Sequence, residues 1–267
     1  MPLVRTPALV LGTMEYGDSS RIVRVYTRAA GLQSLLARGA KQPRSRLRGV
    51  LDLFHLVDVT YVRKAGRTLH PPRDADLLEA WPRLRADLDR MVAFGAVVRL
   101  LAALSIEDDA NPDLFDVVVR AARAFDDPDL PPEGIEPLRQ FSAWRVLAGK
   151  GYAPEVDRCA SCGAPAGARP SFVVAEGGVV CARCAAGRRA LSTREYGALQ
   201  LFLHGDEGLA ALWRFAGGEA RRLDRIREEF VAWHAGLRPP AEPASVEAAA
   251  DRTPRGRRAP ARGAGGP

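Results

Sequence analysis

The segment CASCGAPAGARPSFVVAEGGVVCARC, residues 159–184, contains all 4 cysteines of the 267-residue chain. They form two Cys-x-x-Cys pairs, Cys159 with Cys162 and Cys181 with Cys184, with residues 163–180 between the pairs. Each pair can place two thiolates on one tight turn, and two such turns supply the four sulfur ligands of a tetrahedral Zn²⁺ site. The spacing therefore predicts one zinc ion held by these four cysteines.

Two disulfides or four free thiols are the alternative uses of these cysteines. Disulfides require an oxidising compartment, and nothing in the sequence indicates one. A zinc ion with four cysteine ligands has no open coordination position, so we expect it to be structural rather than catalytic. Between the pairs, residues 171–175 and 179–181 read as two short strands joined at Gly177 and Gly178, which predicts a zinc ribbon.

The charge of the chain is unevenly distributed along it. The net charge is +7, and residues 1–80 hold thirteen Lys and Arg against seven Asp and Glu. A locally basic domain of this kind is typical of a module that binds a polyanion. No apolar run reaches transmembrane length and the N-terminus lacks the layout of a signal peptide, so we expect a cytoplasmic protein without a membrane partner.

The first eighty residues predict a small β-barrel. Short apolar or alternating runs are separated by turn residues, which indicates an OB-fold, with an SH3-like barrel as the alternative. The predicted strands are 8–11, 21–27, 32–37, 53–62 and 69–78.

From Trp81 onward the apolar spacing becomes helical, which predicts an α+β multidomain protein in which a zinc ribbon is inserted into a helical bundle. Asn111-Pro112 predicts one helix start, and Ser192 with Glu195 forms a capping box at another. The predicted apolar stripes are Leu84, Leu88, Met91, Val92, Val98 and Leu101; Leu114, Val118, Ala121 and Phe125; Leu138, Phe141 and Trp144; and Leu223, Ile226, Phe230, Trp233 and Leu237.

These patterns divide the chain into five parts. They are an OB-fold domain at 1–80, helical segments at 81–155 and 191–238, the ribbon at 156–190, and a tail at 239–267. The tail consists mainly of Pro, Ala, Gly and Arg, so we expect it to be disordered.

The segment RGAKQPRSRLR, residues 38–48, is the strongest candidate for a functional site. It carries five cations and no acidic residue, and on an OB-fold such cations can follow a phosphate backbone. A solvated charged loop is the alternative. Tyr16, Tyr26 and Tyr61 are either stacking platforms or core residues. The predicted nucleic-acid contacts are Arg38, Lys41, Arg44, Arg46 and Arg48.

Catalytic motifs are not evident, so we expect a protein that is not an enzyme. The four histidines are scattered along the chain, and no phosphate-binding loop is present. A competing interpretation is a zinc-ribbon transcription or assembly factor that contacts nucleic acid through Arg183, Arg188 and Arg189 beside the second cysteine pair.

Three stretches resemble the RecO family of bacterial recombination-repair proteins. They are ALVLGTMEYGDSSRIVRVYTRAAGLQSLLARGAKQPRSRLRG at 8–49, FSAWRVLAGKGYAPEVDRCASCG at 141–163 and GGVVCARC at 177–184. The first contains a Tyr-Gly-Asp-x-Ser turn, a Thr-Arg-x-x-Gly turn and an Ala-Arg-Gly-Ala-Lys-x-Pro-x-Ser loop. The resemblance extends from residue 8 to about 237 and leaves out the tail.

This resemblance implies a function as well as a fold. RecO-like proteins bind single- and double-stranded DNA, anneal complementary strands, and act with RecR in the RecF pathway to load RecA onto DNA coated by single-strand-binding protein. They also contact the C-terminal tail of that protein. By the same resemblance the phosphate contacts are Arg38, Lys41, Arg44 and Arg46, to which Arg48 is added on charge alone. Some family members lack the cysteines, so the shared activity is not expected to reside in the metal.

Overall fold

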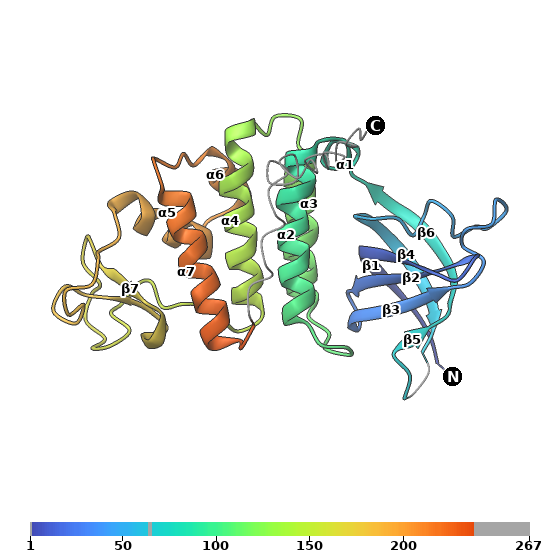
Figure 1. Ribbon diagram of the computed structural model, residues 1–267, viewed down its shortest axis with the longest axis horizontal. Helices are drawn as coiled ribbons and strands as arrows, with labels where there is room; N and C mark the ends of the chain where they lie inside the picture. The colour runs from blue at the N-terminus through green and yellow to red at the C-terminus, as the bar shows by residue number, and fades with distance from the viewer. Residues whose placement is uncertain (1, 64–65, 238–267) are drawn as a thin grey trace, which may run out of the picture.

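The computed structural model describes residues 2–63 and 66–237. The predicted disordered tail, 239–267, lies outside the described residues. Figure 1 shows an elongated arrangement with a β-domain at one end, helices in the middle and the ribbon that contains β7 (Ser171–Val173) at the other end.

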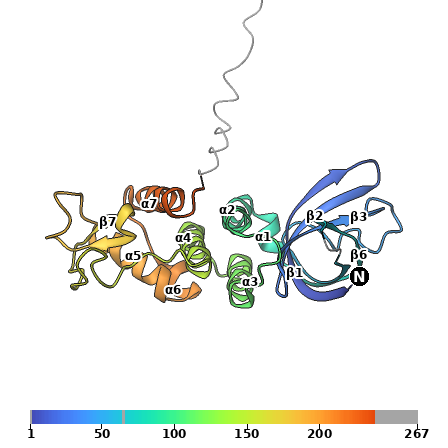
Figure 2. The ribbon, with the colours of Figure 1, turned by 90° about the horizontal axis from the view of Figure 1, so that it is seen from below.

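The β-domain is one six-stranded sheet of β1 (Leu3–Tyr16), β2 (Ser20–Thr27), β3 (Gly31–Ala37), β4 (His55–Val62), β5 (Leu69–His70) and β6 (Pro72–Ala80). The strand order is β5-β3-β2-β1-β4-β6, and only the β3–β5 pair is parallel. The sheet curls strongly (Figure 2), and no ladder among the described residues joins its two edge strands. It is OB-like, as the turn pattern predicts, without being a closed barrel.

Two differences from the predicted strands have local causes. The first strand is fourteen residues long rather than four, because its outer half pairs with β2 in a polar hairpin that has no continuous apolar run. The predicted fifth strand is divided between β5 and β6 at Pro71, which has no backbone N–H to donate to a ladder.

The sheet buries side chains on both faces. Inside the curl, Val10, Val25, Leu35 and Val59 belong to one apolar cluster, which also contains Tyr61. On the outer face, Leu9, Tyr26 and Leu32 belong to the core shared with the helices. Tyr26 and Tyr61 are therefore core residues, and of the three tyrosines considered only Tyr16 is exposed.

The helical region consists of α1 (Pro82–Ala86), α2 (Leu88–Leu104), α3 (Pro112–Asp126), α4 (Pro132–Gly149), α5 (Thr193–His204), α6 (Glu207–Leu212) and α7 (Glu219–His234). Helix α4 packs against α2, α3, α5, α6 and α7, and it lies between them in Figure 2. The predicted caps are present. Asn111 accepts from the Leu114 amide at 2.9 Å, and Ser192 and Glu195 form the capping box.

The predicted apolar stripe at 84–101 is confirmed only in part, because Leu84, Val98 and Leu101 are buried and Met91 packs against the core but two members are exposed. Leu88 and Val92 have exposed fractions of 73 % and 58 %, and Leu84 belongs to the separate helix α1. Asp87 caps α2 by accepting from the Arg90 amide, and the buried face that follows contains Arg90, Phe94 and Val97 among others. Trp233 at the end of α7 is likewise exposed rather than buried.

Two sets of charged side chains lie inside the helical region. The Arg90 guanidinium donates to three backbone carbonyls at 2.8–3.0 Å. Phe125 is in the last turn of α3, and Asp127 and Leu130 follow this helix. Asp224 of α7 lies between Arg139 of α4 and Arg227. Because buried charges are stable only when they are paired, both sets tie distant segments together.

Candidate metal centre and nucleic-acid interface

The ribbon is built on β7 and β8 (Gly178–Val180), which are joined by a short 3₁₀ turn, η1 (Val174–Glu176). Cys159 and Cys162 precede this hairpin, and Cys181 directly follows β8. In the first turn the Gly163 amide donates to the Cys159 carbonyl at 2.8 Å. In the second the amides of Cys184 and Ala185 donate to the Cys181 carbonyl at 3.0 Å. Each Cys-x-x-Cys pair therefore forms a closed turn, as the spacing predicts.

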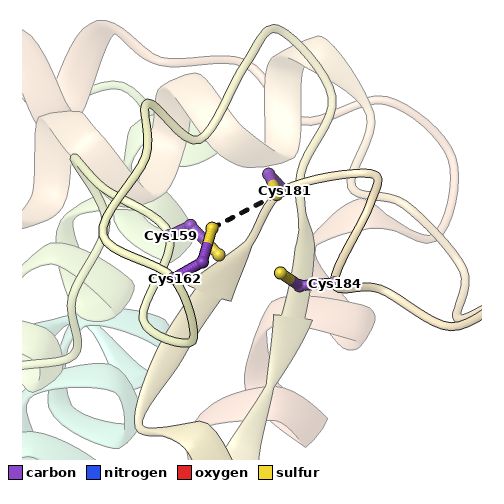
Figure 3. A group of neighbouring side chains, drawn as sticks. All are labelled: Cys159, Cys162, Cys181 and Cys184. Atoms are coloured by element: carbon purple, nitrogen blue, oxygen red, sulfur yellow. Dashed lines mark hydrogen bonds between the residues drawn. The ribbon is translucent and has the colours of Figure 1, made fainter.

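The four sulfur atoms converge on one point (Figure 3). All lie within 4.8 Å of one another, and Sγ of Cys162 is 3.9 Å from Sγ of Cys181. A tetrahedral zinc ion with Zn–S bonds of about 2.3 Å has S···S edges of about 3.8 Å. All four cysteines are unbonded to one another, which excludes the disulfide alternative in this structure. The cluster fits a single ion of this size and geometry.

The thiols differ in the ease with which they lose a proton. Backbone hydrogen bonds, the largest from Cys181, lower the pKa of Cys159 to about 6. Hydrogen bonds from Cys162 and then Cys181 raise the pKa of Cys184 to about 12. Four thiolates this close repel one another, so their joint deprotonation requires a cation in their midst.

The ribbon has little core of its own. Its buried cluster consists of Cys159, Val173, Val180, Cys181 and Ala185, with Cys184 packed against it. The opposite face of the hairpin belongs to the main core, where the Phe172 ring lies 5.9 Å from the Phe230 ring of α7. The hairpin base is thus attached to the helices, whereas the cysteine turns depend on their own contacts.

The basic loop follows β3 and covers one end of the curled sheet. Ala40 and Leu51 are buried in the inner cluster of the sheet, and Leu47 and Val50 are packed against it. Successive backbone hydrogen bonds, from Gln42 to Gly39 and onward to Leu51, fold the loop into consecutive turns. These apolar residues anchor the loop, and Arg44, Arg46 and Arg48 between them are exposed.

The structure separates the five predicted contacts into two kinds. Arg38, Arg44, Arg46 and Arg48 are exposed, and none forms an ion pair with the residues that the structure describes. Lys41 Nζ instead lies 2.9 Å from a Glu15 carboxylate oxygen and donates to the Gly17 carbonyl at 3.4 Å. Lys41 thereby fastens the loop to the β1–β2 turn, and its ammonium lowers the pKa of Glu15.

The two histidines of the β-domain are buried and have contacts within the fold. His55 is buried and its Nδ1 lies 2.9 Å from the Val50 carbonyl oxygen, and the buried His70 ring stacks on Tyr61. Two further arginines, Arg67 and Arg73, lie with Arg38 around one hollow. No sequence motif links these two arginines to the loop, because they come from the segment that precedes β5 and from the start of β6.

Among the described residues, no helix is both long and apolar enough to cross a membrane. An OB-like domain, a helical body and a ribbon with a four-cysteine cluster define a multidomain protein of the OB-fold class. Two family models match this chain: that of the N-terminal part of recombination protein O matches residues 1–81, and that of its C-terminal part matches residues 85–243. The chain belongs to the RecO family.

Individual relatives agree with this assignment. The chain is 31% identical over 242 residues to the DNA repair protein RecO of Anaeromyxobacter dehalogenans strain 2CP-C, covering 89% of this chain and 94% of that protein. It is 35% identical over 187 residues to the protein of the same name from Rubrobacter xylanophilus, covering 69% and 72% of the two chains. The resemblance seen in the sequence motifs is thus confirmed.

Proposed function

We propose that this protein is a non-enzymatic DNA-binding mediator of recombinational DNA repair. It binds single- and double-stranded DNA through Arg38, Arg44, Arg46 and Arg48 and anneals complementary strands. The observation that carries the proposal is the outward row of unpaired arginines on an OB-like domain in a chain of the RecO family. Arginine suits this task because its planar guanidinium can bind phosphate through two hydrogen bonds.

The family relationship supports the rest of the proposed role. The protein acts in the cytoplasm with RecR to help load RecA onto DNA coated by single-strand-binding protein, whose acidic C-terminal tail it contacts. One structural Zn²⁺ bound by the four cysteines holds the ribbon in shape. A closed four-sulfur site leaves no position for a reacting water, which supports a role for the metal in folding rather than turnover.

The salt dependence of DNA binding tests the arginine contacts. Each phosphate contact on a single strand contributes about 0.7 to the slope of log affinity against log salt concentration. Replacing Arg44, Arg46 and Arg48 by glutamine should lower the slope by about 2, whereas replacement by lysine should retain most of it. An unchanged slope in the folded glutamine variant would exclude these residues as DNA contacts.

The ribbon offers a second candidate surface, since Arg183, Arg188 and Arg189 are all exposed. If the ribbon is the nucleic-acid contact of a transcription or assembly factor, replacing these three arginines by glutamate should abolish binding. Under the proposal favoured above, the same variant retains the binding that the loop provides. A strand-annealing assay on both sets of variants distinguishes the two functions.

A further inference from the structure

The outer face of the β-sheet is covered by the helices at one end of the strands β1, β2 and β3 but not at the other end. One row of paired residues across these strands, Leu9–Tyr26–Leu32, is buried against the helices. Further along the same strands the row Met14–Ile22–Leu36 is formed in the same way, since Met14 pairs with Ile22 and Ile22 with Leu36. This second row lies outside both large apolar clusters.

A bulge in β1 decides which side chains reach this outer face. The register shifts between Val10 and Gly12, so the additional residue Leu11 lies in the core shared with the helices. Beyond the bulge, Met14 and Tyr16 are two residues apart and therefore both lie on the outer face. Their exposed fractions are 61 % and 52 %, which are large for apolar and aromatic side chains on a paired strand. Ile22 and Leu36 are half-buried beside them.

Cations flank this apolar row on two sides. Arg24 is exposed one row away, where it pairs with Ser34, which in turn pairs with Leu69 of β5. Next to the row lies a hollow of about 680 Å³ whose lining includes Leu36, Arg38, Arg67, Leu69 and Arg73 and no carboxylate. None of the arginines forms an ion pair within the described part of the chain. The hollow is in the size range of ligand sites.

We propose that this face is a base-stacking subsite for single-stranded DNA. Unpaired bases lie on Met14, Tyr16 and the Ile22–Leu36 row, and the adjoining phosphates are held by Arg24, Arg38 and the arginines of the hollow. The inference rests on the proposed function, because it places the bases of a strand whose phosphates continue along the basic loop. In a duplex the base faces are stacked inside the helix, so only an unpaired strand can use this surface.

An acidic peptide with apolar residues is the other ligand that such chemistry could accept. Single-stranded DNA is favoured by continuity. Arg38 borders the hollow and is also the first cation of the loop, so one strand can follow both surfaces without a break. Stacking on exposed aromatic and apolar side chains is also tolerant of base sequence, as strand annealing requires.

The test variant replaces both Met14 and Tyr16 by serine. The control variant replaces Leu88 and Val92 of α2 by serine, since these two side chains are also apolar and exposed. Binding of labelled oligothymidine and of a labelled duplex is measured at several salt concentrations. The Met14/Tyr16 variant should bind oligothymidine about tenfold more weakly, within the range expected for loss of base stacking. Its salt slope and duplex affinity should not change, and the Leu88/Val92 control should match the unaltered protein. Thermal unfolding shows that each variant is folded.

The outcomes separate this inference from the proposed function. If the Met14/Tyr16 variant binds oligothymidine normally while the loop glutamine variant does not, the stacking subsite is wrong and the DNA-binding function stands. If the unaltered protein binds neither DNA, the proposed function itself fails. Binding of an oligo-aspartate peptide that ends in phenylalanine is measured as well. If the Met14/Tyr16 variant loses affinity only for this peptide, the face is a peptide site and the inference is overturned.

Discussion

Loss of the proposed zinc ion should loosen the cysteine turns of the ribbon more than the base of its hairpin. The variant Cys159→Ser tests this expectation. Zinc contributes about 10–16 kcal/mol in isolated zinc-finger peptides, which is as large as the whole stability of a typical domain. The buried cluster of the ribbon consists only of small side chains. Apart from two valines it contains Cys159, Cys181 and Ala185. The cysteine turns therefore lack the apolar burial that could maintain them without the ion.

The structure sets the expected size and extent of the effect. Losing even about 4 kcal/mol of local stability raises amide hydrogen exchange about a thousandfold, because each 1.4 kcal/mol is a factor of ten. We expect this increase at residues 159–170 and 181–189. Phe172 and Val179 belong to the main core, so the amides at the hairpin base should remain protected. The β-domain, which lies at the opposite end of the molecule (Figure 1), should exchange as before.

Hydrogen exchange read by mass spectrometry, together with a measurement of bound zinc, provides the assay. Ser161→Ala is the matched control, since Ser161 is exposed between the first two cysteines and leaves all four ligands in place. Unchanged exchange in the cysteine turns of a metal-free Cys159→Ser variant would refute a structural role for the ion. Zinc near zero in freshly purified, reduced protein would refute the site itself.

Three further perturbations test contacts that the fold depends on. Arg90→Met should destabilise the protein by about 3 kcal/mol in urea unfolding, because two buried carbonyls and one partly buried carbonyl lose a charged donor. Arg99→Met on the exposed side of α2 should have little effect; equal losses of stability in the two variants would show that the Arg90 hydrogen bonds do not stabilise the fold. Burial alone raises the pKa of Asp224, but its two arginine neighbours more than offset this and lower it. Its stabilising effect is therefore present above the unfolded-state pKa of about 4 and is lost as pH falls through the lower folded-state pKa. Asp224→Asn should thus be less stable than the unaltered protein at neutral pH, and the difference should shrink in unfolding measurements below about pH 4; a constant difference would argue against the ionic contact. Lys41→Gln should lower the salt slope of DNA binding by less than the roughly 0.7 per contact expected of a free cation, because this ammonium already pairs with Glu15; a full-sized decrease would show that the ion pair opens on binding.

Features that depend on neighbouring residues were predictable from the sequence. The cysteine turns, the Asn111 cap and the Ser192–Glu195 capping box each need only a few consecutive residues, and all are present in the structure. The positions of strands β2 to β4 were also predicted closely, because alternating Val and Leu residues mark them without reference to the rest of the chain.

Features that depend on distant partners were not predictable. Arg90 is buried because carbonyls 35–40 residues further along the chain accept from it, and no local pattern encodes this. The exposed Leu88 and Val92 follow a helical spacing, but the cap at Asp87 and the packing of α2 set a different buried face. The pairing of Lys41 with Glu15 likewise required the loop to meet the β1–β2 turn.

The arrangement of the molecule also limits what the metal can do for DNA binding. The β-domain and the ribbon are separated by the helices (Figure 1), each of which is about 10 Å across with its side chains. The charge of a four-thiolate zinc site is screened over about 8 Å at physiological ionic strength. A metal ion bound by the four cysteines would therefore not alter the proposed DNA affinity of the loop arginines directly through its field. An effect of zinc on DNA binding would have to pass through the packing of α4, or arise from a strand long enough to reach both ends of the molecule.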